Sequence, residues 1–454
     1  MFKELNAMTD EEKLQEIEDL ESILNLTQKS SIENLLHQRI DTTLLKKYQM
    51  TMTPNGQLFH VNRRGFLAEM MNEMYDDRKK YKKMAIEGKK QLELETDPQN
   101  RTEIENRIAR FNNLQIAKKV CLVSAYGALG SEYFRFFDIR QASAITTAGQ
   151  LAIQWIGLRL NEYLNKLLKT NDRDYIIASD TDSVYICFDE LVCQTFGKEN
   201  QDTSRIIKFL DKVSETKIQP FIDKSYDDLA RYLNSLEQKM HMKREVLADK
   251  GIWTAKKRYI LNVHNSEGVQ YAKPEIKVSG LEMIKSSTPS ACRTKLKESL
   301  NIIVNGTNEE MIKFIEEFRE QFKTLPLAEI AIPRGVNGII EYTDSKTGLC
   351  TKGTPIHVRG CIIYNHLLKQ QKLSKKYPEL KEGDKIKFIY LREPNIIRSN
   401  IISFSDVLPN EFDLEGMIDY STQFEKSFLE PLKIILDCIG WQTEKKHSLL
   451  GFFS

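Results

Sequence analysis

Two aspartates stand close together between two apolar stretches, in the segment YIIASDTDSVYICF (residues 175–188). β-Branched and aromatic residues cluster on both sides, and Ser-Asp-Thr-Asp is typical of a turn, so the segment predicts a β-hairpin with Asp180 and Asp182 at its tip. Two carboxylates this close repel each other unless a cation or a solvated turn relieves the repulsion. The spacing alone leaves both alternatives open.

If these two aspartates bind a metal ion, their sequence context favours magnesium over calcium. Counted from Asp180, a calcium loop needs glycine at its sixth position and glutamate at its twelfth, where Tyr185 and Leu191 stand. Magnesium needs only one or two protein carboxylates, because phosphate oxygens and water complete its octahedron. Two such ions about 4 Å apart would stabilise the attacking and leaving oxygens of an in-line phosphoryl transfer.

Two long helical patterns, at residues 66–94 and 101–125, precede the aspartates. The Thr-Asp-Pro-Gln break at 96–99 ends the first, so the two helices should form an antiparallel helical hairpin.

Basic residues on these helices could bind a polyanion. Arg78 and Lys82 share one face of the first helix, and Lys119, Val123 and Tyr126 share one face of the second. If the two faces meet, the cations line one cleft that suits phosphate groups. A solvated charged surface is the alternative for either helix alone.

A second basic segment, TAKKRYILNV, leads into apolar residues and predicts a strand. It contains Lys256, Lys257 and Tyr259. Consecutive cations in a strand point to opposite faces, and such residues commonly reach for phosphates or groove edges. An edge strand protected by lysines is the alternative. The segment VSGLEMIKSSTP adds Gly280 and Lys285 just before a predicted domain boundary near residue 286.

The composition of the 454-residue chain is that of a globular protein, with 41% hydrophobic and 29% charged residues, and its length suggests about three domains. It has no apolar run that could cross a bilayer and no signal peptide, so we expect a cytosolic protein without a membrane partner. Seven cysteines without a CxxC pair indicate reduced thiols. The net charge of +2 excludes no class of partner.

The remaining pattern predicts one amphipathic helix over residues 1–45, then a hairpin around the Pro-Asn-Gly turn that follows Met50. Further helices are predicted at 142–168 and within 200–240. Beyond residue 286 amphipathic helices return, with a β-rich interruption at 355–405.

Taken in order, these motifs resemble those of the family B DNA polymerases, in particular the replicative polymerases of T-even-type tailed phages. ASDTDSVYI resembles the catalytic hairpin, usually Tyr-Gly-Asp-Thr-Asp-Ser, and KKVCLVSAYGALG resembles the fingers motif, usually Lys-x-x-x-Asn-Ser-x-Tyr-Gly. DDRKKYKK resembles the opposite fingers helix, KKRY the motif that tracks the primer, and VSGLEMIKSSTP the start of the thumb. The motifs follow the family order over about residues 50–454.

The resemblance implies an α+β fold shaped as a polymerase right hand, with an antiparallel palm sheet, helical-hairpin fingers and a mostly helical thumb. The implied domains are an N-terminal helix leading into the palm (1–60), fingers (61–125), palm (126–285), thumb (286–440) and a clamp-binding tail (441–454).

The resemblance also implies a DNA-directed DNA polymerase that joins deoxynucleoside triphosphates to primer-template DNA with two Mg²⁺ ions. Asp182 would hold both metal ions, and Asp180 would support the site or ligate less directly. The implied triphosphate ligands are Arg78, Lys82 and Lys119, with Tyr126 and Gly127 as the floor under the nascent base pair. The implied DNA-binding residues are Lys256, Lys257, Tyr259, Gly280 and Lys285.

The apolar end SLLGFFS is similar to the segment with which the phage polymerases bind a sliding clamp. The implied clamp-binding residues are Leu449, Leu450, Phe452 and Phe453. A tail folded back on the thumb is the alternative.

Three positions depart from the family pattern. Val123 stands where asparagine is usual, Ala178 where tyrosine is common, and Ser179 where glycine is usual. If the turn requires a positive φ at residue 179, a serine there costs roughly 1 kcal/mol or more of folding free energy relative to glycine.

The family's first catalytic segment, Asp-x-x-Ser-Leu-Tyr-Pro, has no match in the sequence, and neither has the exonuclease. Glu245 could be at best an auxiliary ligand. We therefore expect the carboxy-terminal part of a split polymerase, whose magnesium site is shared with an N-terminal polymerase/exonuclease chain in the cytoplasm of an infected cell. The alternative is a non-catalytic DNA-binding or scaffolding relative that kept the fold.

Overall fold

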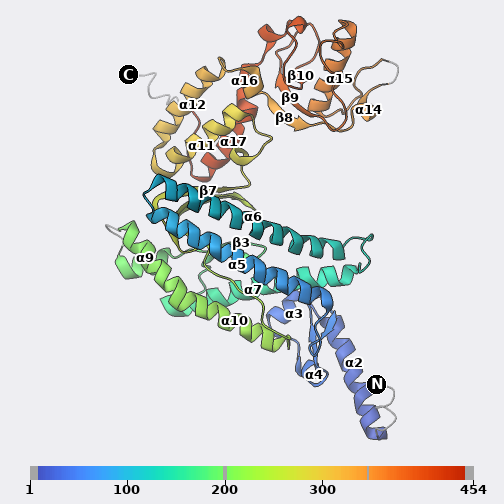
Figure 1. Ribbon diagram of the computed structural model, residues 1–454, viewed down its shortest axis with the longest axis vertical. Helices are drawn as coiled ribbons and strands as arrows, with labels where there is room; N and C mark the ends of the chain where they lie inside the picture. Colours follow the sequence, from blue (N-terminus) through green and yellow to red (C-terminus); the bar gives the residue numbers. More distant parts are fainter. Residues whose placement is uncertain (1–8, 198–201, 345–346, 445–454) are drawn as a thin grey trace. The chain divides into compact units, whose positions relative to one another are not determined.

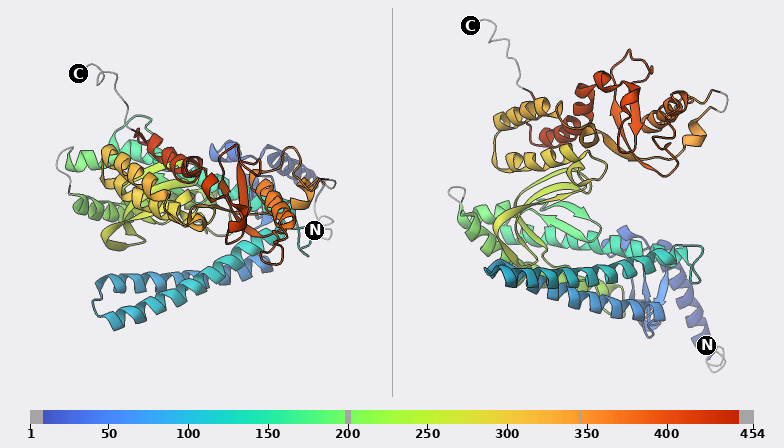
Figure 2. Two further views of the ribbon diagram at one scale, coloured as in Figure 1. Left: turned by 90° about the horizontal axis from the view of Figure 1, so that it is seen from above. Right: turned by 45° about the horizontal axis from the view of Figure 1, so that its top comes forward.

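The computed structural model describes residues 9–197, 202–344 and 347–444 (Figures 1 and 2). The chain forms two compact units. Met1–Leu247 and His264–Pro274 make up the first, and Ala248–Val263 and Glu275–Ser454 make up the second. The expectation of an α+β fold is confirmed, and the structure combines helices with small antiparallel sheets.

The first unit begins with three helices where a single helix over residues 1–45 was predicted, and that prediction is wrong. A capping box between Thr9 and Glu12 starts α2 (Asp10–Lys29). The Ser31 side chain accepts a hydrogen bond from the Asn34 backbone N–H and so begins a new helix. The later helices are α3 (Ile32–Leu36) and α4 (Thr43–Lys47). The predicted hairpin follows as β1 (Met50–Met52) and β2 (Leu58–His60).

Two long antiparallel helices come next, as predicted: α5 (Phe66–Leu94) and α6 (Pro98–Leu129), which lie side by side (Figure 1). Asp97 caps α6 by accepting hydrogen bonds from the N–H groups of its first turn, and the ring of Pro98 fits there because that position needs no donor. Helix α6 runs four residues beyond the predicted end at 125, so Gly127 lies inside it rather than after it.

The core of the first unit forms around α7 (Ile139–Leu168), whose apolar face includes Leu151, Trp155 and Leu160. The Trp155 indole Nε1 donates a hydrogen bond to the Ser225 carbonyl at 2.9 Å, which fixes α7 against a later helix. The helical region predicted within 200–240 is confirmed. Its elements and the preceding helix are α8 (Asp189–Phe196), α9 (Thr203–Val213), a π-helical turn (Ser214–Ile218) and α10 (Gln219–Tyr232).

A three-stranded sheet in the order β5-β6-β7 contributes residues to both units. Its strands are β5 (Val246–Ala255), β6 (Arg258–Ser266) and β7 (Val269–Ser279). The prediction of one strand through TAKKRYILNV is wrong, because Lys256 and Lys257 form a turn between β5 and β6. The lysines therefore do not alternate between the faces of a strand.

The second unit combines helices with the antiparallel sheet β10-β9-β8. The segment 355–405, predicted to be β-rich, holds a fifteen-residue helix besides two strands. The elements are α11 (Ser290–Asn305), α12 (Asn308–Phe322), α13 (Leu327–Ile330), β8 (Ile332–Gly335), α14 (Ile339–Tyr342), α15 (Ile356–Gln370), β9 (Lys385–Tyr390), β10 (Ile401–Phe404), α16 (Tyr420–Phe424), a π-helical turn (Glu425–Leu429) and α17 (Glu430–Cys438).

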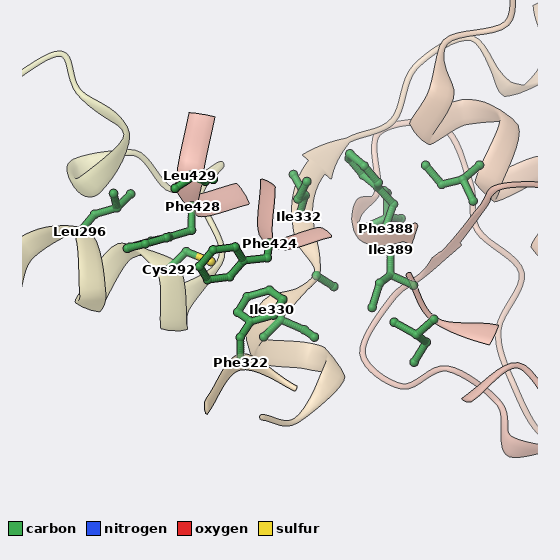
Figure 3. Packing of buried hydrophobic residues seen from close by; sticks show 14 of the residues in the cluster. Cys292, Leu296, Phe322, Ile330, Ile332, Phe388, Ile389, Phe424, Phe428 and Leu429 are labelled. Atoms are coloured by element: carbon green, nitrogen blue, oxygen red, sulfur yellow. The ribbon is translucent and has the colours of Figure 1, made fainter. Parts of the chain in front are cut away.

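Aromatic rings fill the helical part of this second core (Figure 3). Phe428 lies 4.7 Å from Phe318 and 5.2 Å from Phe424, measured between ring centroids, and Phe322 meets Phe424 at 5.3 Å. All four rings are buried, so their apolar area is removed from water and their edges pack against faces. This cluster joins α12 to α16 and the turn that precedes α17.

No helix in the described part of the chain has both the length and the apolarity required to cross a membrane.

Phe428→Ala should reduce the free energy of unfolding of the second unit by about 3–5 kcal/mol, because it leaves a cavity among packed rings. Urea denaturation followed by circular dichroism measures the loss. Ile434→Ala on the neighbouring helix is the control, since Ile434 is 41% exposed. Equal losses for the two variants would show that the ring cluster does not stabilise this unit.

Candidate active site

The two aspartates lie at the tip of a tight hairpin, as the sequence predicts. Strands β3 (Ile176–Asp180) and β4 (Ser183–Ile186) pair antiparallel, with Asp180 opposite Ser183. Thr181 and Asp182 form the two-residue turn between them. Asp180 is half-buried and Asp182 is exposed, so the tip presents one carboxylate to solvent and partly shields the other.

The base of this hairpin is fixed to α7. Tyr175 is 1% exposed, and its backbone N–H donates to the Asn161 side-chain oxygen at 2.8 Å. Its phenol shares a hydrogen bond of 2.8 Å with Thr170. Because the strands start from a buried and bonded residue, the position of the tip is set by the core of the first unit.

The backbone at the tip explains one departure from the family pattern. The positive φ that the turn requires falls at Thr181, with φ of 51°, and Ser179 is an ordinary strand residue. Serine in place of glycine at residue 179 therefore causes no backbone strain. The Asp182 N–H donates to the Asp180 carbonyl at 2.6 Å, and the Thr181 hydroxyl donates to the Asp180 carboxylate at 3.0 Å.

A buried phenol that the sequence analysis did not single out lies within electrostatic reach of the tip. Burial, together with the Asp182 carboxylate, raises the pKa of Tyr226 on α10 to about 12. The phenol therefore keeps its proton at neutral pH. Tyr226 falls on the apolar face of α10 beside Ile222 and Leu229, a pattern that indicates a core residue rather than a site residue.

The tip alone offers two carboxylates to a metal ion. Within residues 9–197, 202–344 and 347–444, no three acidic, histidine or cysteine side chains gather as a metal site. Glu245 does not join the pair. Hard oxygen ligands at one exposed position fit magnesium, which takes its other ligands from water and phosphate.

Contacts between α5 and α6 set the direction of the predicted phosphate-binding cations. Lys118 pairs with Asp77 at 2.7 Å, and its hydrogen bond lowers the pKa of Asp77. Arg78 and Lys119 each follow a member of this pair, so each is rotated by about 100° from the line of contact. Because the helices are antiparallel, both rotations lead to the same side of the pair.

Residues further along both helices reach this same side, which we call the cationic side. By helical spacing it includes Lys82 on α5, and Val123 and Tyr126 on α6. Val123 and Tyr126 are 59% and 39% exposed, so α6 leaves them free of the core. Arg78 Nε is buried and has no hydrogen-bond partner among the described residues. Lys82 pairs with Glu267, a contact that no sequence pattern indicates.

The predicted DNA-binding residues of the second unit lie together. Gly280 has a φ of +66°, and a Cβ built on it would lie 2.2 Å from the Lys257 carbonyl oxygen. Lys257 itself has a φ of 62°. The turn that exposes Lys256 and Lys257 therefore fits glycine at residue 280 far better than any residue with a Cβ.

Lys285 joins the same group through an acidic residue. Both carboxylate oxygens of Glu282 accept hydrogen bonds of 2.6 Å from Arg258, and one accepts a 3.1 Å bond from Lys285. Burial alone would raise the pKa of Glu282, but the bond from Lys285 and the charge of Arg258 lower it overall. Tyr259 lies half-buried beside Arg258, at 6.4 Å from the Trp253 ring.

The predicted clamp-binding residues, Leu449, Leu450, Phe452 and Phe453, lie outside the described residues.

Gly280→Ala should destabilise the β5–β6 turn by at least about 1–2 kcal/mol, because alanine disfavours a positive φ and its Cβ would strike the Lys257 carbonyl. Hydrogen exchange should show faster exchange at residues 254–260. Gly416→Ala is the control in the same unit, since a Cβ there would meet nothing within 4 Å. Unchanged exchange in Gly280→Ala would contradict the close contact.

Comparison with known proteins identifies the relatives of this chain. The model of DNA polymerase family B matches residues 21–395. A DNA-directed DNA polymerase of Enterobacteria phage T4 is 36% identical over 359 residues, and one of Escherichia phage RB69 is 34% identical over 367 residues. These matches cover 76% and 78% of this chain but only 39% of each relative, so the chain spans about two fifths of the length of its relatives. With its aspartate hairpin, antiparallel helix pair and family match over most of its length, the chain belongs to DNA polymerase family B.

Proposed function

We propose that this chain carries the nucleotide-joining centre of a DNA-directed DNA polymerase, acting on primer-template DNA and deoxynucleoside triphosphates. The observation that carries the proposal is the exposed carboxylate of Asp182 beside Asp180 at the tip of a hairpin anchored in the core. Magnesium held by these carboxylates would supply charge stabilisation at an in-line phosphoryl transfer. Since the relatives are phage proteins, the proposed place of action is the cytoplasm of an infected cell.

The helix pair would bind the triphosphate through its cationic side. Arg78 offers a planar fork of donors that matches phosphate oxygens, and Lys119 and Lys82 offer point charges. A glycine inside a helix costs about 1 kcal/mol relative to alanine, so the glycine at residue 127 needs a reason other than helix stability. A floor under the nascent base pair, where a side chain would be in the way, is the reason that we propose. A Cβ on Gly127 would meet nothing within 4 Å, so internal packing does not account for the glycine.

The second unit would contact the primer-template duplex. The exposed turn at Lys256 and Lys257 presents two ammonium groups, and Lys285, which pairs with Glu282, is a further cation of this unit. Cations of this kind bind the DNA backbone without reading base sequence, which suits an enzyme that copies any template. The proposal also assigns the fingers to residues 61–125, the palm to 126–285 and the thumb to 286–440. It further assigns clamp binding to the tail, residues 441–454.

A further carboxylate is needed on the other side of the metal ions, because a two-residue turn cannot surround them. We propose that a partner polypeptide with the Asp-x-x-Ser-Leu-Tyr-Pro segment and the exonuclease supplies it. The support is that the described residues hold no third ligand beside Asp180 and Asp182, and that the relatives are longer.

Helix α2 is the proposed contact for that partner. Leu14, Ile17 and Leu24 are each more than half exposed and share one face by helical spacing. The helix carries seven acidic and two basic residues, which disfavours a second copy of itself and favours a partner surface that is apolar with a basic rim.

Primer extension with Mg²⁺ tests the proposed function. The chain mixed with the partner polypeptide should extend a primer, and Asp182→Asn in the same mixture should reduce the rate by at least about 10³-fold while DNA affinity stays within a few-fold. Asp182→Asn keeps the volume of the side chain but removes its charge and replaces one carboxylate oxygen by an amide NH2 group.

Two outcomes separate the parts of this proposal. Efficient extension by the isolated chain would disprove the need for a partner but not the polymerase function. DNA binding without extension in any mixture would favour the non-catalytic scaffolding relative.

Lys119→Ala should reduce kcat/KM for the incoming nucleotide by about 10- to 100-fold, the loss typical of one hydrogen bond to a charged group. Single-nucleotide incorporation measured over a range of triphosphate concentrations gives this ratio. Arg110→Ala is the matched control, because Arg110 is an exposed cation of α6 that helical spacing places on the opposite side. If both variants lost activity equally, the cationic side would have no special role.

A further inference from the structure

The turn between β6 and β7 contacts one of the proposed phosphate-binding cations. Glu267 lies in this turn and its carboxylate pairs with Lys82 of α5. The next residue of the turn also meets α5, since a Cβ built on Gly268 would lie 3.3 Å from Lys90 Nζ. The Glu267 carboxylate is therefore paired with the Lys82 ammonium group, to which the triphosphate would bind.

This ion pair is exposed enough to be exchanged for another anion. The Lys82 and Glu267 side chains are 44% and 27% exposed, so water screens their attraction. Arg78, one turn earlier on α5, differs from Lys82, because its buried Nε has no hydrogen-bond partner among the described residues. A triphosphate could contact Arg78 without displacing a carboxylate, whereas contact with Lys82 requires an exchange.

The backbone of the turn does not account for a glutamate at this position. Glu267 has a φ of 51° and Gly268 a φ of +82°, and a two-residue turn with two positive φ values prefers asparagine, aspartate or glycine at its first residue. The longer side chain of glutamate is unfavourable for the turn.

Hydrogen bonds connect this turn to buried and partly buried polar groups. The Gly268 N–H donates to the Asn265 side-chain oxygen at 3.1 Å, and Asn265 is 2% exposed. Arg244 donates to the same Asn265 oxygen at 2.6 Å and pairs with Asp211 of α9. The Glu267 N–H donates to the Glu245 carbonyl at 2.6 Å. These bonds place the turn next to α5, where the Glu267 carboxylate pairs with Lys82.

We propose that Glu267 is an internal competitor of the incoming triphosphate: it neutralises Lys82 when no nucleotide is bound, and the phosphates displace it. The inference rests on the proposed function of Lys82 as a triphosphate ligand. Glu267 then sets how tightly the nucleotide binds, because part of the binding free energy is spent on breaking the ion pair. It also keeps Lys82 from holding other anions.

Calorimetric titration of the full chain with inorganic tripolyphosphate at low ionic strength tests the proposal. Glu267→Gln should bind the probe up to about fivefold more tightly, the most that a partly exposed ion pair accounts for. Glu267→Asn, which the turn geometry favours, should bind more tightly to the same degree. Lys82→Ala should bind less tightly, and Glu267→Gln should have no further effect in that background.

Glu87→Gln is the matched control, because Glu87 is an exposed carboxylate of the same helix that pairs with Lys83 at 3.9 Å. It should leave the affinity unchanged. An equal gain for Glu87→Gln and Glu267→Gln would overturn the proposal, since the effect would then be one of net charge. Weaker binding by Glu267→Gln would also overturn it, because Glu267 would then orient Lys82 for the phosphate.

Hydrogen exchange provides an independent measurement. Saturating tripolyphosphate should increase exchange at residues 264–270 of the wild-type chain and not in Glu267→Gln, where the contact is already broken. No change in the wild-type chain while the probe is bound would overturn the proposal. If Lys82→Ala and Arg78→Ala both leave tripolyphosphate binding unchanged, the proposed triphosphate site itself fails, and that result is distinguishable from the failure of Glu267 alone.

Discussion

The register between α5 and α6 depends on one close approach, where Gly88 lies against Ile108. A Cβ on Gly88 would come within 2.8 Å of Ile108 Cγ1, so the helices meet at this level only because the side chain is absent. The Tyr81 and Phe111 rings then stack at 6.4 Å between centroids. A slip of one residue would turn the cations by about 100°, away from the side they now share.

The same helix pair has little core of its own. Ala85 and Gly88 are the buried residues of α5, and Ile108 and Leu129 are those of α6. Elements with few buried apolar contacts open or shift at low cost in free energy, whereas the aromatic cluster of the second unit resists such changes. The triphosphate proposed to bind α5 would therefore act on a part of the fold that moves at low cost in free energy.

Local features of this fold were predictable from the sequence, and contacts between distant segments were not. The bounds of α5 follow from an uninterrupted helical pattern that stops at a proline, and the tip of the aspartate hairpin follows from turn residues between β-branched strands. The Lys256–Lys257 turn was missed because lysine is no turn signal. What permits it is the absence of a Cβ at Gly280, more than twenty residues later. The Lys82–Glu267 pair joins residues far apart in the chain, which no periodicity can indicate.

Three hairpin tips in this chain share a backbone feature. Thr181, Lys257 and Glu267 all have positive φ, with values of 51°, 62° and 51°. A side chain in this conformation costs roughly 1 kcal/mol or more, which glycine would avoid. Selection for folding alone would replace all three by glycine or asparagine. The three tips instead carry a threonine beside the aspartates, a lysine and a glutamate. Each lowers thermal stability but places a chemical group at a defined position. A substitution that raised the melting temperature at one of these tips would therefore remove a side chain of the proposed site.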